Sequence, residues 1–406
     1  MEKRGALFSS VAAVLSALLL SFVLHDPNSV PNIYSDVVSF WGRCWVQNGV
    51  PPYLNSSTCF ATAGTSPFNN GTAFEYPPLS GWLTYLARVV GGYFAANFPD
   101  AGGGQSGYYD AFGVMSLIAA VVLAWSCWKI AKKLGRRLNP LYFFLPSVVI
   151  YGIYNFDLFH ALFVMLSLQA LLYGRKSASA ASLGLAISTK LVSAVLIPVF
   201  LIEIRDKRDA LKFLTLVIGV VAFFNVPLMV ANYQNWLQTY TYLRSWGLED
   251  AWFGWIFQSP ATWGYAKIFG FTLMGALLLR VYTLKTDVTI KTFLALTAYL
   301  LGTYIYAPQF NLMLIPLVAV MAVDHPSVYL WDTFNALIIL TWFIGFPSPN
   351  WSPTMPWTLP QEFALLRDVM LVWMAAWVLR AQGWNLRSLL PHRRQKTLDS
   401  ALPRAR

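Results

Sequence analysis

The chain has 406 residues, of which 57% are hydrophobic and 12% are charged, and its mean hydropathy is +0.51. Apolar runs long enough to cross a bilayer recur along its length, which excludes a soluble globular protein and predicts a polytopic all-α membrane protein. The net charge of +11 does not indicate nucleic acid binding, because Lys and Arg occur in short clusters between the apolar runs. Such clusters are typical of the cytoplasmic ends of membrane helices.

The first apolar segment runs from Ala6 to Leu24 and follows Lys3 and Arg4. It has no small-residue cleavage site, so we expect a retained signal anchor with its N-terminus inside. The loop that follows, residues 25–108, would then lie outside. A loop of this length, rich in Gly, Pro and aromatic residues, is expected to carry function.

Within this loop, Ser35 is expected to cap a helix that runs to about Asn48 and stops at Gly49. The apolar face of this helix would lie along the membrane surface. Asp36 falls in its first turn. There it either complements the helix dipole or serves as a catalytic base at the membrane surface.

Two apolar stretches are ambiguous, Leu79–Phe98 and Ser177–Glu203. Every basic cluster falls inside if the first stretch lies in the outer interface and the second is a pair of short helices meeting near Lys190. The first stretch has an apolar face at helical spacing, and its Arg88 would be unfavourable in the middle of the membrane. Both features favour a position in the outer interface. Each half of the second would be only ~20 Å long, short of the ~30 Å hydrocarbon layer, so a single tilted helix remains the alternative.

We therefore expect one transmembrane domain over residues 1–406, with about twelve membrane helices and both termini cytoplasmic. The expected outer loops are 25–108, 232–261 and 347–363, and the expected cytoplasmic tail is 382–406. The expected helices are 6–24, 109–131, 138–153, 157–173, 177–189, 191–203, 211–231, 262–282, 289–306, 309–323, 327–346 and 364–381.

Three N-x-S/T sequons, at Asn55, Asn70 and Asn350, fall in the expected outer loops and agree with this topology. Cys44 and Cys59 share the first of these loops, where a disulfide is permitted. The sequence leaves open whether these two cysteines are bridged.

Three basic residues are candidates for a functional positive charge. Lys190 is favoured, because an ionisable residue in the middle of an apolar run is costly and is usually functional. Its alternative is a lysine that snorkels to the interface. Arg43, shortly after Asp36, and Arg244, in the second outer loop, are lesser candidates whose alternative is an ordinary surface charge.

Further polar candidates lie at the outer ends of the expected helices. Asp157 and His160 begin one apolar helix, where they either meet hydroxyl groups or help to orient Asp36. Asn155 and Asp157 are also suited to capping that helix. Glu75 and Tyr76 are also candidates for contacts with hydroxyl groups, and the alternative for Glu75 is an ion pair with Arg88. Gln309 and Asn311 either bind hydroxyl groups or cap their helix and hydrogen-bond between helices.

Five motifs occur in order along the chain: D-x3-F-x8-G-x-P-P-Y from Asp36, F-x-Y-P-P-L at 74–79, N-F-D at 155–157, G-L-A-I-S-T-K-L at 184–191 and A-P-Q-F at 307–310. In this order they resemble the polyprenol-phosphate-mannose-dependent mannosyltransferases of glycosyltransferase family 87. The first portion is also similar to the catalytic subunit of the first mannosyltransferase of GPI-anchor synthesis. Both belong to the GT-C class of membrane glycosyltransferases.

The resemblance implies a GT-C-like helix bundle with juxtamembrane helices in the first outer loop. It also implies that an acidic residue of that loop is the catalytic base and that the donor is a sugar linked to polyprenyl phosphate. Asp36 is the matching position. With such a donor, the candidates for binding its phosphate are Lys190, Arg43 and Arg244. The candidates for binding the sugar or the acceptor are Glu75, Tyr76, Asp157, His160, Gln309 and Asn311. The interval from Tyr53 to Phe74 is longer than this pattern expects and leaves the shape of the loop open.

The expected function is transfer of a hexose, mannose by resemblance, from the lipid donor to an acceptor hydroxyl of a glycolipid or glycan. Transfer would occur at the extracytoplasmic face of a plasma or endoplasmic reticulum membrane, with inversion and with Asp36 as general base. No metal or cofactor site is expected, although a divalent ion shared with the phosphate is compatible with the sequence. A transporter or lipid flippase is the alternative, and it predicts an internal repeat that the sequence does not display.

Overall fold

The structure is a computed structural model that describes residues 2–29, 32–62, 64–97, 103–344 and 352–382. It is 75% helical without strands in this part of the chain, which confirms the predicted all-α class. The longer α-helices are α1 (Glu2–His25), α4 (Pro78–Asn97), α5 (Gly104–Lys133), α7 (Asp157–Leu172), α8 (Lys176–Thr189), α10 (Lys207–Ala231), α11 (Tyr233–Ser245), α12 (Trp263–Thr283), α13 (Val288–Gly302), α15 (Pro326–Trp342) and α16 (Leu359–Ala381). The shorter α-helices are α2 (Asp36–Ser39), α3 (Cys44–Gln47), α6 (Pro146–Tyr151), α9 (Leu196–Ile204) and α14 (Ile315–Met321).

Several connections are 3-10 helices: η1 (Phe40–Gly42), η3 (Pro140–Phe144), η4 (Leu191–Val195), η5 (Trp252–Trp255), η6 (Pro260–Thr262) and η7 (Pro308–Met313). Three predicted membrane helices include such a 3-10 segment: 138–153, 191–203 and 309–323. The segment 138–153 breaks at Leu145, because Pro146 disfavours the helical conformation of the residue before it. The segment 309–323 begins as η7 and becomes α-helical only at Ile315.

Four helical segments of the described chain are long and apolar enough to cross a membrane: Gly5–His25, Gly104–Lys133, Lys207–Ala231 and Pro260–Thr283. Shorter apolar helices accompany them. The chain is thus a helical membrane protein, while the count of about twelve spans stays a prediction.

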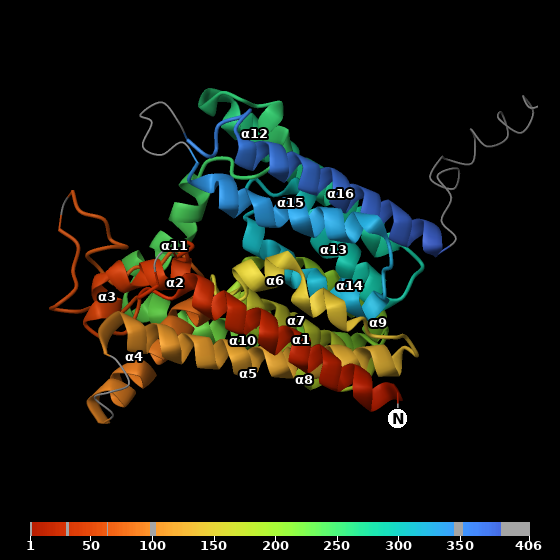
Figure 1. Cartoon of the computed structure of the whole chain (residues 1–406), viewed down its shortest axis with the longest axis horizontal. Helices are drawn as coiled ribbons and strands as arrows, with labels where there is room; N and C mark the ends of the chain where they lie inside the picture. Colours follow the sequence, from red (N-terminus) through yellow and green to blue (C-terminus); the bar gives the residue numbers. More distant parts are fainter. Residues whose placement is uncertain (1, 30–31, 63, 98–102, 345–351, 383–406) are drawn as a thin grey trace, which may run out of the picture.

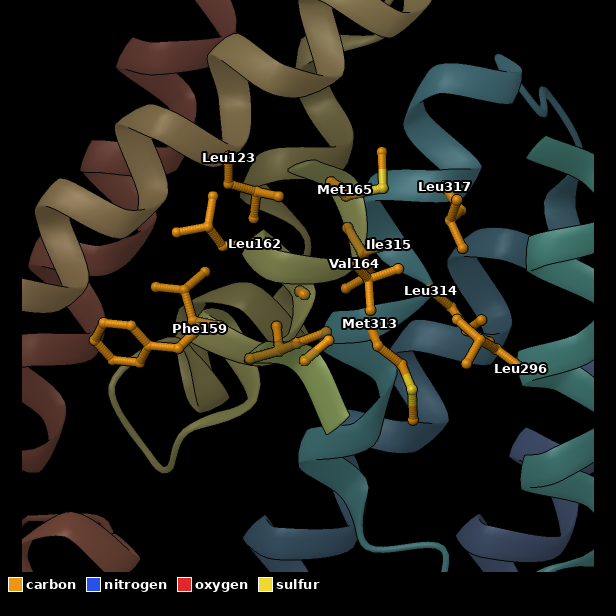
Figure 2. Close-up of a cluster of buried hydrophobic side chains, with 14 of the residues drawn as sticks. Leu123, Phe159, Leu162, Val164, Met165, Leu296, Met313, Leu314, Ile315 and Leu317 are labelled. Carbon is orange, nitrogen blue, oxygen red and sulfur yellow. The ribbon is translucent and has the colours of Figure 1, made fainter. Parts of the chain in front are cut away.

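The elements of the first loop gather at one end of the molecule together with α11, and the N-terminus lies at the opposite end (Figure 1). Helix α5 packs on α1, α4 and α7, while α8 packs on α7 and α10. A buried hydrophobic cluster lies where α7 meets the segment from η7 to α14 (Figure 2). It includes Phe159, Val164, Met313 and Ile315. This core gives a rigid base to the start of α7 and to η7.

The predicted single helix from Ser35 to Asn48 is wrong, because the backbone is extended at Arg43 (φ −78°, ψ 133°) and separates α2 and η1 from α3. At this break the N–H of Cys44 donates to the Asn69 carbonyl at 2.9 Å rather than to a helical partner. The predicted N-cap is confirmed, since Ser35 accepts a hydrogen bond from the N–H of Val38.

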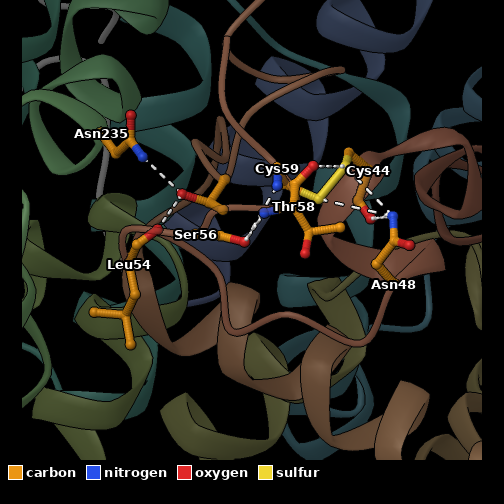
Figure 3. The surroundings of a disulfide bond; sticks show 8 residues. Cys44, Asn48, Leu54, Ser56, Thr58, Cys59 and Asn235 are labelled. Carbon is orange, nitrogen blue, oxygen red and sulfur yellow. Dashed lines mark hydrogen bonds between the residues drawn. A yellow bond between two sulfur atoms is a disulfide. The ribbon is translucent and has the colours of Figure 1, made fainter.

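Cys44 and Cys59 form a disulfide, which resolves the alternative that the sequence left open (Figure 3). Around it, the Asn48 amide donates to the Cys44 carbonyl, and Ser56 accepts from the N–H groups of Thr58 and Cys59. The bridge closes a loop within the segment that carries Asp36 and the Tyr-Pro-Pro turn. The long interval after Tyr53 is thereby tied to α3.

Helix α4 packs along α5 and leaves an exposed apolar face that includes Leu86, Val89 and Tyr93. A Cβ at Gly91 would lie 2.2 Å from the Gly107 carbonyl oxygen, so glycine is required for this close approach. The exposed face is compatible with the interfacial position that the sequence predicts, which stays a prediction.

The segment 177–203 consists of two helices, as one of the two alternatives predicts. Helix α8 ends at Thr189, Lys190 is extended (φ −148°, ψ 130°), and η4 and α9 follow. Ser80, at the start of α4, donates to the Thr189 carbonyl at 2.9 Å. The Pro-Pro turn of the first loop is therefore fastened to the helix break that presents Lys190.

The sequon residues Asn55 and Asn70 are exposed. Asn350 lies outside the described residues, as do 345–351 of the third predicted outer loop and 383–406 of the predicted tail.

Candidate active site

The Asp36 carboxylate is held in place by contacts between the first loop and the link from α6 to α7. Ser35 Oγ and the N–H of Val37 both donate to the Tyr154 carbonyl, at 3.3 and 3.2 Å. Asn155 Nδ2 then donates to Asp36 Oδ2 at 2.7 Å, and the Tyr76 hydroxyl donates to the same oxygen at 3.2 Å. Three segments distant in sequence therefore converge on one carboxylate.

Asn155 is a site residue whose part in the site the sequence did not reveal, since it suggested only a helix cap. Its Oδ1 accepts from the N–H of Phe156 at 2.6 Å, which orients Nδ2 toward Asp36. Nδ2 also lies 2.8 Å from the Tyr76 hydroxyl. The N-F-D motif was the available signal, but nothing local indicates a partner 119 residues away.

Burial raises the pKa of Asp36 to about 6. Hydrogen bonds from the hydroxyls of Tyr34 and Tyr76 and the positive charge of Lys190 lower this pKa, but by less than burial raises it. A carboxyl group with this pKa is mostly ionised at neutral pH and remains basic enough to accept a proton. Asp36 therefore has the properties of a general base.

Lys190 and Asp157 form a buried ion pair next to Asp36. Lys190 Nζ lies 2.8 Å from both carboxylate oxygens of Asp157, and the side chains are only 6% and 0% exposed. The ammonium lies 4.3 Å from the centre of the Phe310 ring and 5.8 Å from that of Tyr76. Tyr76 thus contacts Asp36 through its hydroxyl and faces Lys190 with its ring, so both charges belong to one site.

His160 lies one turn after Asp157 and is fully buried. Its Nε2 is 2.6 Å from Ser193 Oγ in η4, and its Nδ1 has no partner within the described part of the chain. This contact links α7 to η4, the 3-10 helix that begins directly after Lys190. His160 therefore supports the ion pair rather than contacting Asp36.

Glu75 forms an ion pair with Arg43, and Arg43 also donates to Asn69 Oδ1 at 2.6 Å. The predicted pairing of Glu75 with Arg88 is wrong. Arg88 instead donates to the carbonyls of Val46 and Gln47, at 2.9 and 3.2 Å. Burial raises the pKa of Glu75, and the charge of Arg43 lowers it by a smaller amount.

Gln309 and Asn311 flank Phe310 in η7, and both are buried. Asn311 Oδ1 accepts from the Tyr306 hydroxyl at 2.6 Å, and its Nδ2 has no partner among the described residues. Arg244 is exposed at the end of α11. No side-chain contact of Arg244 with Asp36, Tyr76 or Lys190 occurs among the residues that the structure describes.

The site combines a partly exposed carboxylate of raised pKa, at the hydroxyl of Tyr76, with a buried ammonium group near the ring of the same tyrosine. In the described chain, no group of three or more His, Cys, Asp or Glu side chains is arranged to hold a metal ion. The carboxylate can accept a proton from an attacking hydroxyl, and the ammonium can stabilise an anionic leaving group.

The buried pair predicts a characteristic stability pattern. Lys190→Met or Asp157→Leu alone leaves an unpaired buried charge and should destabilise the protein by about 3–5 kcal/mol. The double variant should recover most of the loss. The measurement is the thermal unfolding temperature of the purified protein in lipid nanodiscs. Lys176→Met is the matched control, because its ion pair with Asp209 is 38% and 37% exposed and should contribute little. Single variants as stable as the double one would contradict the pairing.

Comparison with known protein families matches residues 74–303 to glycosyltransferase family 87. The match covers more than half of the chain and includes Glu75, Tyr76, Asp157 and Lys190, while Asp36 precedes it. Among curated proteins, none matches the chain significantly. On the extent of the family match, the chain belongs to glycosyltransferase family 87.

Proposed function

We propose that this glycosyltransferase moves a hexose, mannose by the motif resemblance, from a polyprenyl phosphate donor to an acceptor hydroxyl, with Asp36 as general base. The observation that carries the proposal is that Asp36 contacts the hydroxyl of Tyr76 while Lys190 lies over the ring of the same tyrosine. Family membership supports sugar transfer, and the membrane helices support a lipid-linked donor.

The proposed reaction is a single displacement at the anomeric carbon. The acceptor oxygen forms a bond to this carbon while the bond from the carbon to the phosphate oxygen breaks. The acceptor proton passes to Asp36, and the polyprenyl phosphate leaves with the bonding electron pair. Attack opposite to the leaving group inverts the anomeric configuration. A phosphate leaves as an anion and needs positive charge more than a general acid, so one carboxylate is sufficient.

Lys190 is the proposed contact of the donor phosphate. Its ammonium group has three donors, and the pair with Asp157 keeps its charge compensated while the site is empty. Arg43 is engaged by Glu75 and Asn69, and Arg244 is exposed, which makes them secondary candidates for the phosphate. Tyr76 and Asn155 would orient the base, while Gln309 and Asn311 are candidates for contacts with the sugar hydroxyls.

The proposed location of the site is the extracytoplasmic face. A disulfide in the first loop supports this location, because disulfides persist in oxidising compartments. The exposed sequons at Asn55 and Asn70 agree with it. The transporter alternative lacks a supporting observation and does not account for the family match.

Loss of the base should abolish transfer. In membranes carrying the Asp36→Asn protein, transfer of radiolabelled mannose from polyprenyl-phosphate-mannose to endogenous acceptors should fall at least about 100-fold, since a general base contributes about 10²–10⁴. Asp110→Asn is the matched control, because Asp110 is an exposed carboxylate near the start of α5, following the same loop. Equal transfer by the wild-type and Asp36→Asn proteins would eliminate the proposed base.

The pH dependence should report the ionisation of Asp36. Burial raises the pKa of Asp36 to about 6, and only its ionised form accepts a proton. The value of kcat/KM should therefore be maximal above this pKa and fall by about tenfold per pH unit well below it. A phosphodiester donor does not titrate in this range. A profile that remains flat as the pH falls through 6 would be incompatible with the base.

A further inference from the structure

Helix α11 is fastened to the part of the first loop that carries the site. Thr239 Oγ1 donates to the Phe74 carbonyl at 2.7 Å, and Phe74 directly precedes Glu75 and Tyr76. One turn later, the Tyr242 ring lies 4.6 Å from that of Phe68. The last turn of α11 is therefore anchored beside the residues that hold Asp36.

The residues that follow α11 contact the strand-like residues before η7. Glu249 and Ile305 form an isolated parallel β-bridge. The N–H of Glu249 donates to the Tyr304 carbonyl at 3.0 Å, and the Glu249 carbonyl accepts from the N–H of Tyr306 at 2.9 Å. The Tyr304 hydroxyl donates to the Leu243 carbonyl at 2.6 Å. Residues 304–306 precede Phe310, whose ring faces Lys190. Residues 242–249 therefore connect the first loop, at Phe68, to the residues that lead into η7.

A fully buried arginine fixes this connection. Arg367 in α16 donates from Nη1 to the Tyr306 carbonyl at 2.8 Å and from Nη2 to the Asp250 carbonyl at 2.6 Å. Its guanidinium stacks on the Tyr306 ring at 3.4 Å. Arg367 thus acts as a positioning residue for the backbone on both sides of the bridge at Glu249.

Glu249 and two aromatic residues form a group suited to a sugar ring. Trp246 Nε1 donates to Glu249 Oε2 at 2.6 Å, and the Trp246 ring lies 5.1 Å from that of Tyr242. Trp246 is 37% exposed. The other carboxylate oxygen of Glu249 makes no hydrogen bond to any described residue. An aromatic face beside a carboxylate with a free oxygen is complementary to a ring that bears several hydroxyl groups.

The electrostatics connect this group to Asp36. Burial raises the pKa of Glu249 to about 7; the Trp246 hydrogen bond lowers it, and the negative charge of Asp36 raises it further. Glu249 is thus within electrostatic reach of the proposed base. The Glu249 carboxyl group supplies no positive charge for a phosphate, and both of its protonation states hydrogen-bond to hydroxyls, which favours a neutral hydroxylated ring at this position over the donor phosphate.

We propose that Glu249 and Trp246 bind the polyhydroxylated ring of the acceptor and present one of its hydroxyls to Asp36. This inference rests on the proposed function and names the class of its acceptor, a lipid or glycan with a hexose-like ring at the site of attack. Glu249 accepts hydrogen bonds from hydroxyls of the ring, and Trp246 and Tyr242 contact its apolar face.

The test is binding without donor. Purified protein in nanodiscs is titrated with tritiated octyl α-D-mannopyranoside, and tetraethylene glycol mono-octyl ether serves as a ligand with the same alkyl chain and no ring. Binding to empty nanodiscs is subtracted. We expect saturable binding of the mannoside only, weakened about tenfold or more by Glu249→Gln. Trp246→Ala should weaken binding similarly, while Trp246→Phe should retain most of it because an aromatic face remains.

Glu362→Gln is the matched control, since Glu362 is an exposed carboxylate in the first turn of α16. Unfolding temperatures verify that each variant is folded. Equal affinity of the wild-type and Glu249→Gln proteins, or equal binding of the ligand without a ring, would overturn the inference. Because no donor is present, the result does not depend on transfer. A protein that binds the mannoside through Glu249 but transfers no sugar would contradict the proposed function alone.

Discussion

The structure depends on the hydrogen bonds that Tyr76 and Asn155 donate to the carboxylate of Asp36. A charge removed from water needs partners, and these donors come from segments that are remote in sequence. The contact therefore determines how the first loop sits on the start of α7. The same requirement applies to Lys190, whose buried charge is compensated by Asp157 at the start of that helix. Both charges consequently meet at Tyr76.

On the proposed function, this arrangement would account for sugar transfer by a largely apolar protein with few ionisable groups. Desolvation makes the carboxylate more basic, because burial raises the pKa of Asp36 to about 6. Desolvation also strengthens the attraction between a buried ammonium and an anionic leaving group. The hydrophobic core beneath α7 and η7 fixes these elements, so the charges need not be ordered by the substrate.

Local sequence signals predicted part of this structure. The cap at Ser35 depends on neighbouring residues, and the break at Lys190 follows from the cost of a charge within an apolar run. The break at Arg43 could not be predicted, because it depends on a hydrogen bond from Cys44 to the distant Asn69. The contact of Asn155 with Asp36 and the bridge between Glu249 and Ile305 could not be predicted for the same reason, since the partners lie in other segments of the chain.

The anomeric configuration of the transferred sugar tests the account most directly, because base catalysis by Asp36 with departure of the phosphate near Lys190 is a single displacement. The wild-type protein would be supplied with a polyprenyl-phosphate-mannose of known configuration. The linkage of the product would then be assigned by NMR coupling constants. We predict the configuration opposite to that of the donor. Retention would contradict the account, because it requires a covalent glycosyl intermediate on the enzyme and a nucleophile in place of the base.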